Sequence, residues 1–212
     1  MLIVGVSVGV TWLATTLPKT EGSVRLTGIS DPVQIFRDNR GVPHIYAATL
    51  NDAYRALGFT HAQDRFAQME LMRRHGSGSL AEVIGDKGVP SDRFMRTLGF
   101  NRLVQVQLRG LSKSSQSALA AYAAGVNDWL KHRRATLPLE MLLMGYTPNP
   151  WKPEDSLIWG RVMAMWLSGN WRTEFLRLQL ASKLSSEKIN ALWPQIDFTD
   201  EIERNLSPFL PA

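Results

Sequence analysis

The amino-acid sequence predicts a mainly α-helical domain that carries one β-hairpin. Apolar residues recur at helical spacing through most of the chain after residue 50. The clearest case is residues 114–134, where large apolar side chains recur at i, i+3, i+7, i+10 and i+11: Leu119, Tyr122, Val126, Trp129 and Leu130. Strands are indicated only at residues 33–46, where two short apolar runs flank a strong turn signal at residues 38–41.

The composition is that of a folded domain with a sizeable core. Of the 212 residues, 44% are hydrophobic and 20% are charged, which excludes a disordered or collagen-like chain. The absence of cysteine excludes a structural disulfide, a thiolate zinc site and a cysteine nucleophile. The net charge is +5, but the densest basic run, residues 131–134, suits the C-terminal end of a predicted helix. We therefore expect no nucleic-acid partner.

The hairpin comes first in the chain. A strand at residues 33–37 is followed by the turn and by a returning strand at residues 42–46, in which Pro43 is acceptable only near a sheet edge or a strand start. An isolated hairpin is only marginally stable in water. It therefore needs a sheet to join, and this sequence does not supply one.

The downstream helices follow from apolar periodicity and from their end signals. Asn51 is the expected N-cap of the first long helix. Pro153 opens a later helix, which is expected to turn Ile158, Val162, Met165 and Trp166 inward. Residues 138–153 are expected to form a loop with a short Leu/Met run. The predicted helices span residues 51–74, 79–84, 92–109, 114–134, 153–169, 172–184 and 186–193.

The N-terminal region is apolar and uncharged. Residues 2–14 contain no charge, and the first charged residue is Lys19. About 13 apolar residues are fewer than the roughly 20 that span a bilayer as a helix. We expect residues 1–17 to be an export signal or a membrane anchor of a periplasmic or exported protein; a buried N-terminal strand or helix is the alternative. Residues 18–31 are expected to be a linker, 32–200 the helical domain, and 201–212 a C-terminal tail.

The sequence contains few residues in patterns that would support catalysis by this chain alone. The four histidines lack metal-ligand spacing, and no Gly-x-Ser-x-Gly motif occurs. The run at residues 76–80 is expected to be a turn between helices. Residues 61–65 place polar side chains in an amphipathic helix, where His61 is within reach of Asp64 and Arg65. This group is either an acid–base site or a structural network against another segment.

Glu174 is the second candidate residue. It lies at the start of a Leu-rich helix, where free backbone N–H groups stabilise a carboxylate. The alternative is that Glu174 binds a hard cation. Calcium takes about six to eight oxygen ligands, and one glutamate supplies at most two, so most ligands would have to come from elsewhere.

Several motifs, in the same order along the chain, resemble the N-terminal subunit of penicillin acylase-type enzymes. The resemblance covers residues 33–180. The motifs are Arg37-Asp38-x-x-Gly41-Val42-Pro43-His44-Ile45; Asp52; Ala56-x-Gly58-x-x-His61-Ala62-Gln63-Asp64-Arg65-x-x-Gln68-Met69-Glu70; Gly78-x-Leu80-Ala81-Glu82; Asp92-Arg93-x-x-Arg96-x-x-Gly99; Trp151-x-Pro153-x-Asp155; and Leu167-Ser168-Gly169-Asn170 followed by Glu174.

This resemblance implies an N-terminal-nucleophile hydrolase, made as a precursor that cuts itself into a small α and a large β subunit. The α subunit is then largely helical and packs around the αββα sandwich of the β subunit. The implied nucleophile is the first residue of the β subunit, a serine whose own α-amino group acts as base. The implied reaction is hydrolysis of an amide between an acyl group and an amine, as in a β-lactam antibiotic or an acyl-homoserine lactone.

The resemblance also assigns roles to residues of this chain. No Gly-Ser pair continues with the Asn-Asn-Trp-like run expected at the cut, so we expect no catalytic residue in the chain. Glu174 falls at the family's α-subunit calcium ligand, which implies a structural calcium shared with the β subunit. Met163, Trp166 and Leu167 correspond to the stretch that lines the acyl pocket; core packing on an apolar helix face is their alternative role.

A competing hypothesis from another functional class is a non-catalytic helical interaction protein. In that case residues 2–17 would hold the protein to a membrane.

Overall fold

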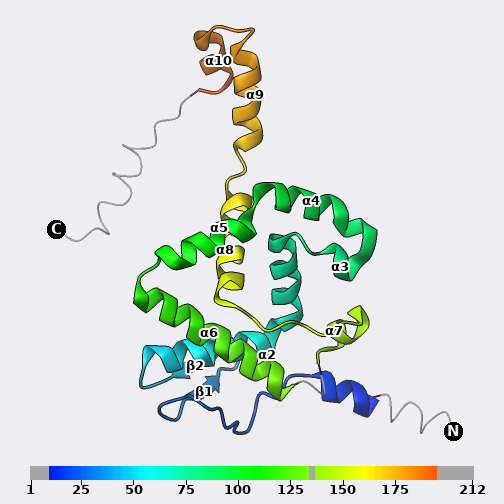
Figure 1. Ribbon diagram of the computed structural model, residues 1–212, viewed down its shortest axis with the longest axis vertical. Coiled ribbons are helices and arrows are strands. Elements are labelled where there is room, and N and C mark those ends of the chain that lie inside the picture. The colour runs from blue at the N-terminus through cyan, green and yellow to red at the C-terminus, as the bar shows by residue number, and fades with distance from the viewer. Residues whose placement is uncertain (1–9, 134–136, 195–212) are drawn as a thin grey trace, which may run out of the picture. The chain divides into compact units, whose positions relative to one another are not determined.

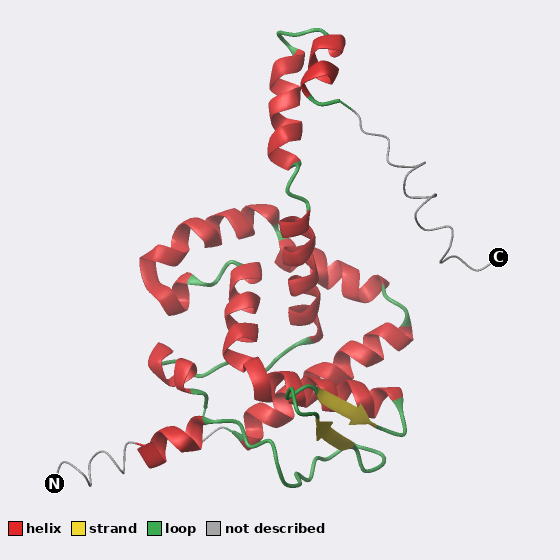
Figure 2. Ribbon diagram, turned by 180° about the vertical axis from the view of Figure 1, so that it is seen from behind, coloured by secondary structure: helices red, strands yellow, loops and turns green. Residues whose placement is uncertain are grey.

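The computed structural model describes residues 10–133 and 137–194, and this part of the chain is helical apart from one two-stranded antiparallel hairpin (Figures 1 and 2). The predicted fold class is therefore confirmed. Internal contacts divide the chain into two units, Met1–Ala164 and Met165–Ala212. The boundary falls within α8 (Pro153–Leu167), and the second unit continues with α9 (Trp171–Ala181) and α10 (Ser186–Leu192).

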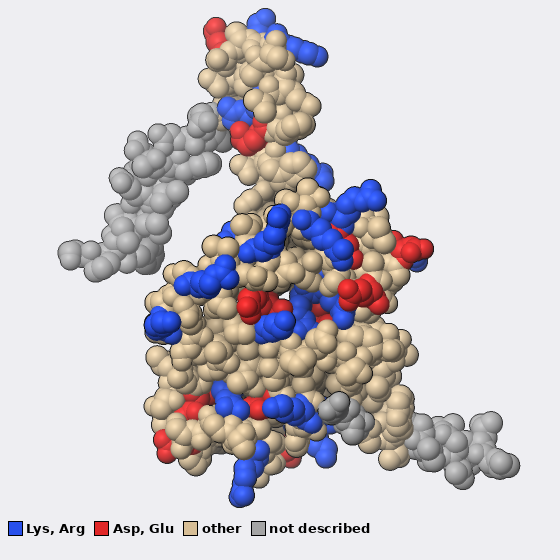
Figure 3. Space-filling view, in the orientation of Figure 1, with Lys and Arg blue, Asp and Glu red and all other residues tan. Residues whose placement is uncertain are grey.

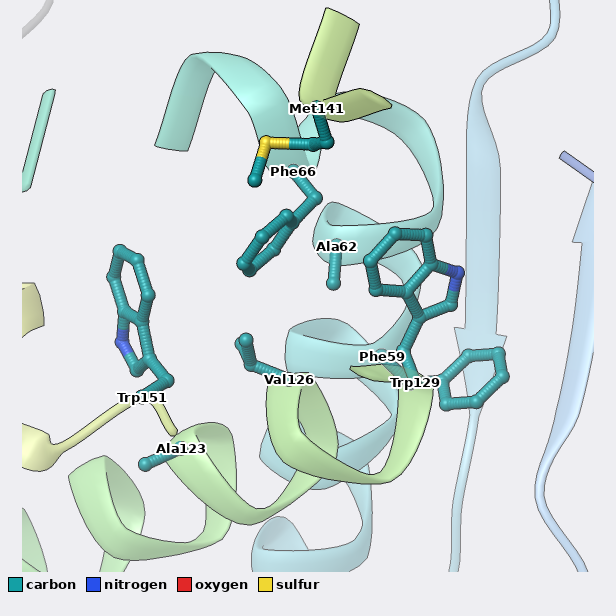
Figure 4. Packing of buried hydrophobic residues seen from close by; sticks show 8 residues of the cluster. All are labelled: Phe59, Ala62, Phe66, Ala123, Val126, Trp129, Met141 and Trp151. Carbon is teal, nitrogen blue, oxygen red and sulfur yellow. The ribbon is translucent and has the colours of Figure 1, made fainter. Parts of the chain in front are cut away.

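Two long helices, α2 (Leu50–Ser77) and α6 (Lys113–His132), cross in the first unit and supply most of its core. The rings of Phe66 and Trp129, one from each helix, lie 5.3 Å apart. A short helix, α7 (Leu139–Met144), and the loop that follows it close the core with one side chain each. The buried cluster comprises Phe59, Ala62, Phe66, Ala123, Val126, Trp129, Met141 and Trp151 (Figure 4).

The close approach of α2 and α6 depends on one glycine in each helix. Gly58 of α2 faces the backbone carbonyl of Tyr122, and Gly125 of α6 faces the backbone carbonyl of Arg55. A Cβ atom at either position would overlap that carbonyl group. The crossing therefore requires glycine on both helices, because any larger residue would hold the two backbones further apart.

The hairpin consists of β1 (Gln34–Arg37) and β2 (Pro43–Tyr46). Its turn is closed by two backbone hydrogen bonds: the Gly41 N–H donates to the Asp38 carbonyl at 2.9 Å, and the Asp38 N–H donates to the Val42 carbonyl at 3.1 Å. Gly41 has a φ of +79°, which glycine adopts without strain in this bulged three-residue turn. The predicted hairpin and its turn are confirmed.

The beginning of α2 differs from the prediction. Its N-cap is Thr49, whose hydroxyl oxygen accepts a hydrogen bond from the Asp52 N–H at 3.1 Å. The assignment of Asn51 as N-cap is wrong, because Asn51 lies within the first turn. The Asp52 carboxylate in turn accepts hydrogen bonds from the hydroxyls of Thr49 and Ser30, which fixes this cap. The C-terminal end agrees with the predicted turn: Gly78 closes the helix in a left-handed conformation, φ 69°.

The segment between α2 and α6 contains four short elements. They are α3 (Ala81–Ile84), the 3-10 helix η1 (Gly85–Gly88), α4 (Val89–Leu98) and α5 (Phe100–Gly110). The single helix predicted over residues 92–109 is wrong. Gly99 adopts a φ of +69° and ends α4, and α5 begins at the next residue. The loop predicted after residue 138 likewise contains α7, which Gly145 ends in the same way.

The N-terminal residues 10–16 are helical and contact the end of α6. The guanidinium of Arg133, which is buried, donates hydrogen bonds to the carbonyls of Thr15 at 2.8 Å and Leu17 at 3.1 Å. Residues 1–9 of the predicted export segment and the predicted tail at residues 201–212 lie outside the described residues. Among the helices that are described, none is long and apolar enough to cross a membrane.

Candidate functional site

The polar run at residues 61–65 makes contacts with two other elements. His61 Nδ1 lies 3.0 Å from the hydroxyl of Tyr122 on α6, and the two rings meet edge to face at 68°. Burial lowers the pKa of His61, and the nearby Arg65 lowers this pKa further, whereas the Asp64 carboxylate opposes the change. Burial also raises the pKa of Tyr122 to about 12. The pair therefore favours a neutral imidazole beside a protonated phenol.

Asp64 and Gln63 hold the hairpin to α2. The Arg37 guanidinium at the end of β1 donates to the Asp64 carboxylate at 2.6 and 3.2 Å and to the Gln63 side-chain oxygen at 3.0 Å. Two parallel bonds from one arginine to one carboxylate give a well-defined geometry. Of the two roles open for this polar run, the observed contacts are those of a structural network against other segments.

A groove of about 1030 Å³ opens beside this run, between α2, α6 and the beginning of α8. Its walls are largely apolar, and His61 and Arg65 contribute polar groups to it. Arg65 has non-helical backbone angles, φ −151° and ψ 31°, so α2 is kinked beside the groove. The remaining lining includes Tyr54, Leu57, Met69, Met72, Leu119 and Trp159.

A buried charge cluster lies in the second half of α2. Glu70 has 0% of its surface exposed and accepts hydrogen bonds from both Arg73 and Arg74, three and four residues along the same helix. Arg73 also donates to the Asp155 carboxylate of α8 at 3.2 Å, and Arg74 donates to the Glu82 carboxylate of α3 at 2.6 Å. One buried carboxylate and two arginines therefore join α2 to both α8 and α3.

The same arginines fix the loop that precedes α8. Arg73 donates to the backbone carbonyls of Asn149 and Pro150 at 3.2 Å each, and its guanidinium lies 5.1 Å from the Trp151 ring centre. Arg74 lies over the Tyr146 ring at 4.4 Å. Burial raises the pKa of both Asp155 and Tyr146, and the Lys152 N–H and Arg73 oppose the rise at Asp155. The cluster is thus a framework that determines where α8 starts.

Sequence reasoning missed this cluster. Glu70 entered the prediction only as part of a motif, and no contact was predicted for Arg73 and Arg74. The signal was present, since a glutamate followed by arginines at i+3 and i+4 places all three side chains on one helix face. The contact between His61 and Tyr122 has no such signal, because it depends on how α2 and α6 cross.

Two of the three predicted acyl-pocket residues lie at the exposed end of α8. Met163 is partly buried, on a helix that buries Ile158 and Val162 as predicted. Trp166 is 51% exposed and Leu167 is 80% exposed. The prediction that Trp166 turns inward is wrong, because half of its side-chain surface is exposed. This end of α8 presents large apolar side chains at the surface.

Glu174 lies in the first turn of α9, as predicted, and its side chain is 58% exposed. Its carboxylate makes a long ion-pair contact of 3.8 Å with the Arg177 guanidinium. Among the described residues, no group of three or more His, Asp or Glu side chains is placed to hold a metal ion. Glu174 is thus an accessible carboxylate, and a cation bound to it would need all its other ligands from elsewhere.

Helix α9 also exposes apolar side chains. Trp171, Phe175, Leu176 and Leu178 are all exposed. Such a concentration of exposed large apolar residues is typical of a surface that another polypeptide covers. In contrast, basic side chains are spread over several elements and interspersed with acidic ones on the face shown in Figure 3.

Comparison with known proteins gives a consistent set of similarities. The sequence model of the penicillin amidase family matches residues 32–201. An acyl-homoserine lactone acylase QuiP of Pseudomonas aeruginosa is 38% identical over 181 residues, which cover 85% of this chain and 21% of that protein. A penicillin acylase 2 proenzyme of Pseudomonas sp. (strain SE83) is 41% identical over 159 residues, 75% of this chain and 20% of that protein.

The fold has a counterpart among solved structures. A chain of the thermostable penicillin G acylase from Alcaligenes faecalis matches with a TM-score of 0.64 and 30% sequence identity, covering 78% of this chain and 93% of that one. The chain thus spans about a fifth of the length of the curated relatives, but it covers nearly the whole of the matching chain in the solved acylase.

Proposed function

The chain belongs to the penicillin amidase family of amide hydrolases, and on this basis we propose that it is the α subunit of an acylase whose nucleophile resides on a separate β subunit. The observation that carries the proposal is the contrast in coverage. The chain covers 21% of an acyl-homoserine lactone acylase but 93% of one chain of a solved penicillin G acylase. A proenzyme among the relatives agrees with a precursor that yields two chains.

The proposed reaction is hydrolysis of the amide between an acyl group and an amine. The serine hydroxyl at the start of the β subunit attacks the amide carbonyl, and the serine's own α-amino group takes its proton. The C–N bond then breaks, the amine leaves with that proton, and water hydrolyses the acyl-serine ester. This chain supplies none of the reacting groups. Its role is to shape the acyl pocket and to help place the β subunit.

The substrates to be tested are acyl amides that differ in their acyl group. The assembled protein should hydrolyse at least one of a phenylacetyl amide, a glutaryl amide, a long-chain acyl amide and an acyl-homoserine lactone, with release of free amine as the measurement. Failure to hydrolyse any of them would refute the acylase proposal and favour a non-catalytic helical interaction protein held to a membrane by residues 2–17. We propose a periplasmic or exported location, in agreement with the uncharged N-terminal residues 2–14.

Met163, Trp166 and Leu167 are proposed to contact the acyl group of the substrate. Their support is the apolar surface at the end of α8. Leu167→Ala should lower kcat/KM for a long-chain acyl amide about tenfold, because an apolar contact of this size contributes roughly 1–3 kcal/mol to specificity. Steady-state kinetics on long- and short-chain substrates provides the measurement.

The control for this variant is Leu143→Ala, because Leu143 of α7 is 78% exposed and Leu167 is 80% exposed. It should leave the ratio of long-chain to short-chain activity unchanged. If Leu167→Ala also leaves that ratio unchanged, Leu167 does not line the pocket.

Glu174 is proposed to bind a structural calcium ion together with groups of the β subunit. When bound, the ion would join the two subunits by electrostatic attraction to carboxylates from both. Glu174→Ala should lower the calcium content of the assembled enzyme and remove the rise in Tm on adding calcium, since a ligand at 100 times its Kd stabilises a protein by about 2.7 kcal/mol. Elemental analysis and thermal unfolding measure the two effects.

A matched control is Glu187→Ala, which removes an exposed carboxylate from the first turn of α10. This variant should keep the calcium content and the calcium-dependent Tm. Equal calcium content in wild type and Glu174→Ala would show that Glu174 is not a ligand.

A further inference from the structure

The hydrogen-bond pattern of the hairpin defines which backbone groups point away from it. The Asp38 N–H donates to the Val42 carbonyl, so this pair belongs to the hydrogen-bonded set. Hydrogen-bonded and non-hydrogen-bonded pairs alternate along an antiparallel ladder. Phe36 therefore hydrogen-bonds to His44, and Gln34 to Tyr46, through their backbones. In the pairs between them the backbone groups point outward. These are Ile35 and Arg37 on β1, and Pro43 and Ile45 on β2.

The two outer edges of the hairpin are not equivalent. On β2, one of the two outward positions is Pro43, which has no N–H to donate, and this strand contacts α2. On β1, Ile35 and Arg37 each offer an N–H and a C=O. Within the described part of the chain, no other backbone segment hydrogen-bonds to these groups. The outer edge of β1 thus has both donors and both acceptors available for pairing with another strand. The outer edge of β2, called the blunted edge below, lacks one donor.

The two faces of the hairpin also differ. The Arg37 side chain reaches Asp64 and Gln63, so the face that carries Arg37 and the partly buried Ile45 is turned toward α2; Ile35 on the same face is 40% exposed. The opposite face carries Phe36 and Tyr46, both exposed, with their rings 5.9 Å apart in an edge-to-face contact. An exposed aromatic pair on a two-stranded sheet is an apolar surface that still lacks a covering layer.

We propose that the outer edge of β1 pairs with a β-strand of the β subunit, and that Phe36 and Tyr46 pack against apolar side chains of the same subunit. This inference rests on the proposed α-subunit role. Two strands alone are marginally stable, and the described residues contain no third strand. The relatives are about five times as long as the matched region, so they contain the additional chain that can supply this strand. Pairing at a sheet edge is a common mode of recognition between chains.

The aromatic face is tested in the assembled enzyme by replacing Phe36 with p-benzoyl-phenylalanine, which is close to phenylalanine in shape, and irradiating. The expected result is a covalent product of the two subunits, with the cross-link mapped by mass spectrometry to a strand of the β subunit. The control carries the same replacement at Phe94, an exposed phenylalanine of α4. No product from position 36, or the same β-subunit peptide captured from position 94, would overturn the proposal.

The edge is tested with a pair of proline variants. Ile35 and Ile45 face each other across the ladder, and both direct their N–H outward. Ile35→Pro should raise the dissociation constant of the two subunits about tenfold, because it removes a donor from the pairing edge. Ile45→Pro removes the equivalent donor from the blunted edge and should leave that constant unchanged. Equal effects of the two variants would overturn the edge assignment.

The wild-type enzyme separates failure of this inference from failure of the proposed function. If the wild-type subunits co-purify and hydrolyse an acyl amide while neither the cross-link nor the proline contrast is observed, only the docking surface is wrong. If the wild-type protein yields no second subunit and no hydrolysis, the proposed function is wrong, and the docking inference is wrong with it.

Discussion

Replacing Glu70 with alanine should lower the free energy of unfolding by about 3–5 kcal/mol, since removing one partner of a buried ion pair leaves uncompensated buried charge. Glu70 has 0% of its surface exposed and serves both Arg73 and Arg74. Without it, two buried guanidinium groups lose their shared carboxylate. Urea unfolding followed by tryptophan fluorescence is a suitable measurement, because Trp129 and Trp151 are buried in the same unit.

The control for Glu70→Ala is Glu82→Ala. Glu82 pairs with the same Arg74, but its side chain is 64% exposed, and exposed ion pairs contribute about 1 kcal/mol or less. Losing Glu82 should therefore have a small effect. Similar losses of stability for the two variants would show that burial of the cluster does not determine its contribution.

Gly125→Ala should destabilise the protein as much as Glu70→Ala does, with a loss of about 3 kcal/mol or more in the free energy of unfolding. Its Cβ would overlap the backbone carbonyl of Arg55, so α2 and α6 would have to move apart along the core that they share. Overpacking a core by a side-chain carbon costs about 1–3 kcal/mol, and an obstructing backbone relaxes less readily than a side chain. Thermal or urea unfolding measures the loss.

Gly160→Ala on α8 is the matched control for Gly125→Ala. No heavy atom lies within 4 Å of a Cβ built at Gly160, and alanine favours a helix over glycine by about 0.5–1 kcal/mol. This variant should be neutral or stabilising. If Gly125→Ala were equally neutral, the close crossing of α2 and α6 would not depend on glycine.

Local chemistry made much of the fold predictable. The hairpin follows from the turn residues 38–41, and α6 follows from its apolar spacing. The errors occur where a contact with a distant residue, or the φ angle of one residue, determines where a helix begins or ends. Thr49 rather than Asn51 caps α2, because Ser30 and Thr49 together hold Asp52. Gly99 splits a helical pattern that continues on both sides of it, and nothing in the pattern itself shows the left-handed φ.

The site was predictable to a smaller extent. The motif resemblance led to the family, and its assignment of Glu174 stays a prediction. Helical periodicity placed Trp166 in a core, whereas its side chain is exposed. The contacts between Arg37 and Asp64 and between His61 and Tyr122 join segments far apart in sequence. Such contacts depend on how helices cross and on how a hairpin lies on them. Neither can be predicted from the local pattern of a single sequence.

The two hydrogen bonds from Arg133 to the carbonyls of Thr15 and Leu17 have a practical consequence for recombinant production. A shortened protein that begins at residue 18 would deprive one nitrogen of a buried guanidinium of both acceptors, at a cost of about 1–3 kcal/mol. The same holds for any processing event that removes the first 17 residues. A truncation that preserves the native stability therefore begins before Thr15.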